Sequence, residues 1–285
     1  MLKWEWLTKP QTPYTRGFVL RVLLKAALLF TLVNVAFALL HPLPVLGQLS
    51  IYNWLVPGRS RLPYGENAAQ SYNLSLMSID AMFASHEIAR PKAANEYRVL
   101  VVGDSATWGI LLRPEETITG VLNAENMTTA DGRQMRFYNI AHPVLALSKD
   151  LMLLDYAMRY QPDMVIWLFT AQSFPVEQQL YPPLVQHNAE TLRRLISEYN
   201  LSIDPQSEQF VNPTLRDTTL VGSRRDLADM LRLQLYGFAW AATGIDQYYP
   251  VSYMPRATDL ENDLSWYRYS EPQEFTQVDL SLDVL

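Results

Sequence analysis

The chain has 285 residues, of which 49% are hydrophobic and none is cysteine, and its formal net charge is −6. This hydrophobic content is too high for a disordered chain, and the length is sufficient for one sizeable domain with appendages. The acidic balance, without a basic stripe, argues against nucleic-acid binding. The absence of cysteine excludes disulfides, thiolate metal sites, iron–sulfur clusters and covalently attached c-type haem.

The N-terminal region contains a long apolar segment. There is no Asp, Glu, Lys or Arg from Ala26 to Gly58, and Ala26–Leu40 is almost wholly apolar. With Phe18–Leu24 ahead of it, this segment is long enough for a helix of about 20 residues across a bilayer. The sequence therefore predicts one membrane span within residues 1–45.

Basic residues lie mainly before this span. Those that precede it are Lys3, Lys9, Arg16, Arg21 and Lys25, whereas Arg59 and Arg61 follow it. This asymmetry places the N-terminus in the cytoplasm and everything after residue 45 outside. A cleaved signal peptide is the alternative, but the leader is long and Ala36-Phe37-Ala38 lies inside the apolar run instead of after it. An uncleaved signal anchor is favoured.

Residues 46–96 are expected to connect the span to the main domain. Residues 57–70 contain prolines and glycines that indicate a linker, and a helix is predicted after them. Its apolar face comprises Leu74, Met77, Ala81 and Met82, and it stops before Pro91. The main domain is expected over residues 97–285.

The main domain alternates strand-like and helix-like segments. The predicted strands are Arg98–Gly103, Arg136–Ile140 and Met164–Phe169, of which the first and third are apolar enough to be covered on both faces. The predicted helices are Ser148–Tyr160, Asn188–Tyr199 and a segment that begins at Ser223. This alternation indicates βαβ units and a parallel sheet, hence an α/β fold.

The turn Gly103-Asp104-Ser105 follows the first strand and precedes Ala106-Thr107-Trp108-Gly109. A serine at a strand-to-helix turn can be a nucleophile, and its peptide N–H can stabilise an oxyanion. The alternative is a purely structural turn, in which Ser105 caps the helix and Asp104 binds backbone N–H groups.

The stretch Arg98–Thr117 resembles the first signature block of the SGNH/GDSL hydrolase family. The resemblance implies a three-layer α/β/α, flavodoxin-like fold with Ser105 in the position of the nucleophile. It also implies further blocks that supply the oxyanion donors and the catalytic base.

Two of those blocks depart from the family pattern. The family has a glycine after the second strand, whereas this chain has Asn139-Ile140-Ala141-His142-Pro143-Val144. Asn139 can either face the site or close a turn. The family has Gly-x-Asn-Asp after the third strand, whereas this chain has Phe169-Thr170-Ala171-Gln172-Ser173. Thr170 or Gln172 is then the candidate donor of a hydrogen bond to the oxyanion.

The catalytic histidine of the family belongs to a late Asp-x-x-His motif. The histidines of this chain are His41, His86, His142 and His187, and Asp279-Leu280-Ser281-Leu282 has leucine at the histidine position. Without a base, a serine hydroxyl is a poor nucleophile. His142 is the one histidine expected near a strand end, as a base or as an ordinary turn residue.

The family sheet has five strands, and no further strand-like run of comparable quality follows Phe169. We expect the chain to cover roughly the first two-thirds of a complete fold of this type. No cofactor or metal is indicated, because His86-Glu87 lacks further ligands and Gly120, Gly132 and Gly222 form no phosphate-binding pattern. The apolar segment Leu231–Ala242 is either a core helix or a surface for the bilayer or a partner subunit.

Two functions fit these observations. The favoured hypothesis is a membrane-anchored, SGNH-like accessory subunit of a membrane complex that is catalytically incomplete. The alternative is an extracytoplasmic serine esterase or O-acyltransferase acting on acyl esters of the cell envelope, with the Asp-x-x-His motif in a further C-terminal part.

The charge asymmetry predicts that residues 97–285 lie on the outer side of the membrane. Protease added to sealed right-side-out vesicles should digest the region after the span and leave the N-terminus intact. Immunoblots against tags at the two ends would measure this, and protection of the C-terminal tag would contradict the orientation.

Overall fold

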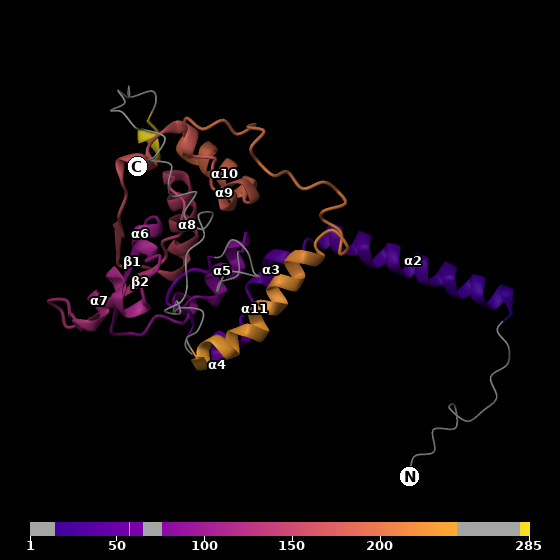
Figure 1. Cartoon of the computed structure of the whole chain (residues 1–285), viewed down its shortest axis with the longest axis horizontal. Coiled ribbons are helices and arrows are strands. Elements are labelled where there is room, and N and C mark those ends of the chain that lie inside the picture. Colours follow the sequence, from indigo (N-terminus) through magenta and orange to yellow (C-terminus); the bar gives the residue numbers. More distant parts are fainter. Residues whose placement is uncertain (1–14, 57, 65–75, 244–279) are drawn as a thin grey trace, which may run out of the picture. The chain divides into compact units, whose positions relative to one another are not determined.

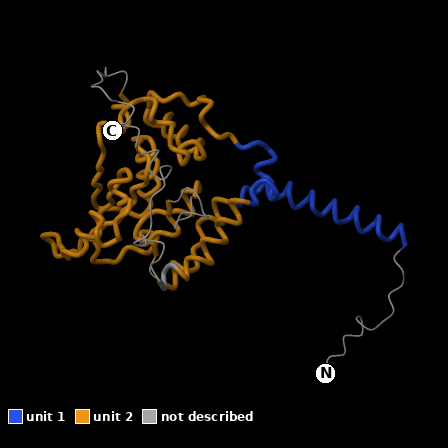
Figure 2. Tube along the Cα trace, viewed as in Figure 1, with its two compact units in different colours: residues 1–42, 213–224 blue, residues 43–212, 225–285 orange. Residues whose placement is uncertain are grey.

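The computed structural model describes residues 15–56, 58–64, 76–243 and 280–285 (Figure 1). The chain divides into two compact units (Figure 2). Unit 1 comprises residues 1–42 and 213–224, and unit 2 comprises residues 43–212 and 225–285. The sheet and the predicted site residues belong to unit 2.

Unit 1 contains helix α2 (Arg16–Leu40), which is long and apolar enough to cross a membrane. Two of its polar side chains donate to backbone carbonyls one turn earlier: Thr31 Oγ1 donates to Ala27 O at 2.9 Å, and Asn34 Nδ2 donates to Phe30 O at 2.9 Å. Such bonds satisfy polar groups where water is excluded. The predicted anchor segment therefore forms one continuous helix.

Unit 2 contains a parallel sheet of three strands in the described residues, in the order β2-β1-β3. The strands are β1 (Glu96–Val102), β2 (Gln134–Asn139) and β3 (Met164–Trp167). Val99 of β1 is opposite Phe137 of β2 and Met164 of β3. The predicted α/β class and all three parallel strands are confirmed.

Helices α6, α7 and α8 lie near the strands of this sheet (Figure 1). The α-helices are α3 (Leu43–Gly47), α4 (Ile51–Leu55), α5 (Ile79–Ser85), α6 (Ser105–Trp108), α7 (Ile118–Ala124), α8 (Leu147–Ala157), α9 (Pro183–His187), α10 (Ala189–Tyr199) and α11 (Arg224–Thr243). The 3-10 turns are η1 (Glu87–Ala89), η2 (Pro114–Glu116), η3 (Met158–Tyr160), η4 (Ala171–Ser173), η5 (Val176–Gln178) and η8 (Leu282–Val284).

Strand β1 is buried on both faces, because its side chains alternate between two cores. Val99 and Val101 pack with Phe137, against which Leu122 of α7 lies. Leu100 and Val102 belong to the larger core, which includes Met152 and Leu153 of α8. Helices thus cover both faces of the central strand, as its apolar sequence predicts.

Strand β3 differs from its prediction. Its apolar sequence predicts burial on both faces, but Met164 and Val165 are exposed. The reason is position: within the described residues β3 is an edge strand, paired with β1 alone. The predicted strand also extends to Phe169, whereas the ladder ends at Trp167.

The connecting region packs into unit 2. The sequence analysis places this region in a linker, but its residues Arg59, Arg61 and Leu62 are buried. The backbone of Arg61 forms an isolated β-bridge with Asn139 at the end of β2. Of the predicted helix that stops before Pro91, α5 covers Ile79–Ser85 and buries Ala81 and Met82, and the 3-10 turn η1 follows it. Leu74 of its predicted apolar face lies outside the described residues. At the other end of the chain, Val284 of η8 is part of the larger core.

The segment Leu231–Ala242 belongs to α11, which buries one face. Met230 and Leu233 are in the core, whereas Leu231 and Leu235 are exposed. The side chains of Trp240, Ala241 and Ala242 lie outside the description.

A buried ion pair fixes the start of the sheet. Arg98 Nε donates to Glu96 Oε1 at 2.6 Å, and its Nη1 donates to Ile88 O at 3.3 Å and to Tyr160 O at 3.1 Å. Tyr138 of β2 donates its hydroxyl to the same Glu96 oxygen at 2.9 Å. Burial raises the pKa of Glu96, but these bonds outweigh burial and hold it below its usual value.

Removing one partner of this pair leaves a buried charge uncompensated. We expect Arg98→Met to lower the free energy of unfolding by about 3–5 kcal/mol. The control is Arg136→Met: Arg136 lies opposite Arg98 in the ladder, but its bond to Glu87 is at the surface. That change should cost less than about 1 kcal/mol. Urea unfolding of the full chain in detergent measures both, and equal costs would contradict the argument.

Candidate functional site

The Gly103-Asp104-Ser105 turn lies at the carboxyl end of the central strand. Strand β1 ends at Val102, Asp104 is the N-cap of α6, and Ser105 is the first residue of that helix. Ligand sites of open parallel sheets gather at this edge. The predicted placement of Ser105, after a central parallel strand and at a helix start, is therefore confirmed.

Only glycine fits before this turn. A Cβ at Gly103 would lie 2.4 Å from Thr107 Oγ1 and 2.6 Å from the carbonyl oxygen of Leu168. The first helical turn and the chain after β3 therefore approach the backbone of Gly103 directly. This close approach holds Ser105 at the sheet edge.

The two polar residues of the turn have different surroundings. Asp104 is buried, and its Oδ1 accepts a hydrogen bond from Ala106 N at 3.0 Å, so it caps α6. Ser105 is partly exposed, and its hydroxyl makes no hydrogen bond within the described residues. A free, partly exposed hydroxyl at a helix start has the geometry expected of a nucleophile, but no described group activates it.

Asn139 closes a turn instead of facing an open site. Its Nδ2 donates to Thr107 O at 2.9 Å and to Trp108 O at 3.4 Å, and its Oδ1 accepts from Ala141 N at 3.2 Å. Because its amide is buried and occupied on both sides, it connects β2 to α6. Of the two predicted roles, the structure therefore supports the turn.

The imidazole of His142 is enclosed by backbone and an aromatic ring. Its Nδ1–H donates to Pro143 O at 3.1 Å, and the ring of Tyr64 lies edge-on with centroids 5.3 Å apart. Burial, followed by the nearby Lys149 charge, lowers the pKa of His142 to about 3. A ring with so low a pKa is a weak base, and no hydrogen bond joins it to Ser105 in the described structure.

Thr170 and Gln172 follow β3 at the same edge. Thr170 is exposed and precedes η4, and Gln172 is partly buried within that 3-10 turn. Neither side chain makes a hydrogen bond within the described part of the chain. Both residues stay candidate hydrogen-bond donors to an oxyanion, and no described interaction orients their side chains.

The sequence analysis missed a buried ion pair at this edge. Lys149 and Asp150, in the first turn of α8, are both almost completely buried, and Lys149 Nζ lies 2.9 Å from Asp150 Oδ1. The ammonium group also donates to Gly103 O at 3.2 Å and to His142 O. The other oxygen of Asp150 accepts from Trp167 Nε1 at 3.0 Å.

This ion pair occupies the space behind the serine turn. The ammonium group of Lys149 donates two hydrogen bonds to backbone carbonyls and pairs with the carboxylate of Asp150. Burial raises the pKa of Asp150, and the attraction of Lys149 offsets that only in part. The sequence analysis predicts a helix with Ser148 at its start, whereas α8 begins at Leu147 and Ser148 lies inside it, where its backbone N–H donates to Gln179 Oε1.

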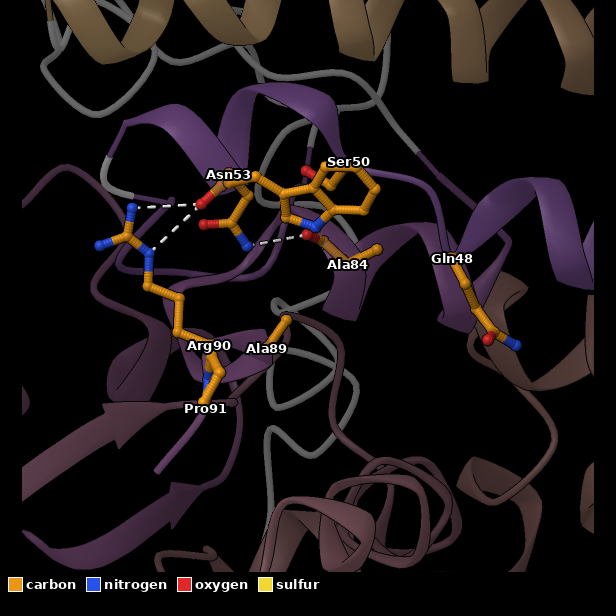
Figure 3. Close-up of a pocket in the computed structure, with 8 residues that line it drawn as sticks. Gln48, Ser50, Asn53, Ala84, Ala89, Arg90 and Pro91 are labelled. Carbon is orange, nitrogen blue, oxygen red and sulfur yellow. Dashed lines mark hydrogen bonds between the residues drawn. The ribbon is translucent and has the colours of Figure 1, made fainter. Parts of the chain in front are cut away.

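A cavity of about 670 Å³ lies elsewhere in unit 2. It is lined by Gln48, Ser50, Asn53, Trp54, Ala84, Ala89, Arg90 and Pro91 (Figure 3). Arg90 turns toward α4 and donates to Asn53 O from Nε and Nη2, at 3.3 and 3.1 Å. These bonds satisfy carbonyls at the end of α4. None of the predicted site residues lines this cavity.

No group of three or more His, Asp or Glu side chains in the described residues is placed to hold a metal ion. No family model matches the chain, and no curated protein is significantly similar to it. The resemblance of Arg98–Thr117 to the SGNH/GDSL family therefore stays a prediction.

The buried His142 predicts a pH dependence of stability. Its pKa is lower in the folded chain than the usual 6.5, so only the unfolded chain binds this proton between pH 6.5 and about 3. Stability is therefore lost as the pH falls through this range, by about 1.4 kcal/mol per pH unit. Between pH 7 and pH 5, His142→Gln should reduce the loss by about 2 kcal/mol.

Urea unfolding of the full chain in detergent at the two pH values measures this difference. His187→Gln is the control, because the residue is exposed on α9, and it should keep the wild-type dependence. An unchanged pH dependence in His142→Gln would show that the pKa of this ring is the same in the folded and the unfolded chain.

Proposed function

We propose that this chain is a membrane-anchored, SGNH-like α/β protein that is catalytically incomplete and acts as an accessory subunit of a membrane complex. The observation that carries the proposal is the state of His142. It is the histidine nearest in sequence to a strand end at the site, and it is buried, bonded to backbone and a weak base.

The other three histidines offer no replacement. His86 is fully buried, accepts from Ile88 N at 3.1 Å, and has a pKa lowered by burial to about 4. His187 lies on α9, and His41 ends the apolar helix in unit 1. No histidine hydrogen-bonds to Ser105 within the described residues, and the sequence has no other histidine.

Two structural features support the accessory role: the apolar helix and the buried ion pair at the sheet edge. A helix suited to span a membrane holds the chain where membrane-complex subunits meet. The buried ion pair of Lys149 and Asp150 occupies the sheet edge behind the serine turn. This arrangement fits a structural role better than a catalytic one, because a catalytic site must leave space for substrate. We propose the anchor as the first contact with such subunits.

A second candidate is an extracytoplasmic serine esterase or O-acyltransferase. One observation favours it: the Ser105 hydroxyl is partly exposed at the start of α6 and makes no hydrogen bond in the described structure. In that case a base from outside the described residues would take the proton, and the α6 N–H groups would stabilise the oxyanion.

Hydrolysis of a short acyl ester separates the two candidates. For the full chain in detergent, we expect the same background rate in the wild type and in Ser105→Ala, within about twofold. The matched control is Ser202→Ala, because Ser202 is an exposed loop residue of the same unit. A rate at least about tenfold above background that disappears only in Ser105→Ala would replace the accessory function by the enzymatic one.

A further inference from the structure

Two helices of unit 2 carry large apolar side chains on their outer sides. These side chains are 43% to 71% exposed, and they are Ile51, Trp54 and Leu55 of α4 and Leu231, Leu235 and Phe238 of α11. We call this set the α4–α11 surface. Isolated exposed apolar residues are ordinary, but a group of this size marks a contact with something apolar.

The two helices are held to each other. Gln234 of α11 donates from Nε2 to Leu49 O at 2.7 Å, and its Oε1 accepts from Ile51 N at 2.9 Å. Tyr52 and Phe238 meet edge-on, with ring centroids 6.5 Å apart. A Cβ at Gly237 would lie 2.2 Å from the Tyr52 ring, so the helices are in close contact. The helices that carry these apolar side chains are therefore packed against each other.

Few residues of the chain separate each of these two helices from unit 1. Leu43, which starts α3 and leads to α4, follows Leu40 by three residues, a reach of at most about 11 Å. Within unit 1, Val221 N donates to Asn34 Oδ1 of α2 at 3.1 Å. Three residues later Arg224 begins α11. Both helices are thus joined to unit 1 through short segments of the chain.

The charge pattern fits a lipid surface. No charged residue occurs from Ala26 to Gly58, which includes all of α3 and α4. The exposed stripe Leu231, Leu235 and Phe238 is uncharged. The charged side chains of α11 are Arg224, Arg225, Asp226, Asp229 and Arg232, and Asp229 pairs with Arg225 and Arg232. Apolar and aromatic side chains with arginine beside them are typical of helices that lie in a membrane interface.

We propose that the α4–α11 surface rests on the bilayer into which α2 inserts, with its apolar side chains in the interfacial region. The proposal goes beyond the accessory function and rests on α2 spanning the membrane. The surface gives unit 2 a second membrane contact and so restricts its rotation about the anchor. A single span alone leaves that rotation free.

The proposal is tested by site-specific labelling of single cysteines introduced into the full chain. Because the chain has no cysteine of its own, only the introduced residue is labelled. Leu55→Cys and Leu235→Cys report on the surface. Leu32→Cys, within α2, reports on the span, and Val121→Cys is the matched control. Val121 is 51% exposed on α7 and belongs to the same unit but not to the surface.

Each variant is labelled with the fluorophore NBD and reconstituted into phosphatidylcholine vesicles. Vesicles that contain nitroxide lipids labelled near the headgroup quench labels in the interface. We expect emission at positions 55 and 235 to fall at least about twofold, with a blue shift relative to position 121, and position 121 to be unaffected. Nitroxide near the bilayer centre should quench position 32.

Three outcomes would overturn the proposal. Quenching at position 32 but not at 55 and 235 would leave the span and remove the second contact. A blue shift at 55 and 235 without lipid quenching would show that protein covers the surface. Absence of quenching at 32 would refute the span itself, and the proposal with it. Far-UV circular dichroism verifies that each labelled variant keeps the wild-type fold.

Discussion

The Lys149 ammonium group lies where the three strands end, and its contacts hold that edge together. It donates to Gly103 O after β1 and to His142 O after β2, and Asp150, its ion-pair partner, accepts from Trp167 of β3. Breaking a buried pair of this kind costs several kcal/mol, because one charge is left uncompensated. The serine turn, the loop with His142 and the start of α8 all depend on this pair.

The same pair limits the chemistry of the edge. A buried cation next to His142 adds to the effect of burial and disfavours the protonated ring. A base must hold the proton that it removes, so the arrangement that stabilises the edge also weakens the adjacent His142 as a base.

The sheet edge of unit 2 and its helices α4 and α11 differ in which side chains they bury and which they expose. At the sheet edge, buried polar side chains such as Asn139 and Lys149 have hydrogen-bond partners within the fold. On α4 and α11, apolar groups are exposed, and short segments of the chain join both helices to unit 1. A protein held at a membrane has a reason for the second arrangement, because apolar surface that meets lipid is removed from water.

The sequence by itself determined the elements whose signal is local. Continuous apolar runs gave β1 and α2, and the glycine before Asp104 marked a strand-to-helix turn that admits no Cβ. Tertiary structure alone decided which of these residues meet. Burial of Lys149, exposure of β3 and enclosure of His142 depend on neighbours distant in sequence. Composition and spacing do not encode those neighbours, because burial and pKa are set by packing and electric fields in space.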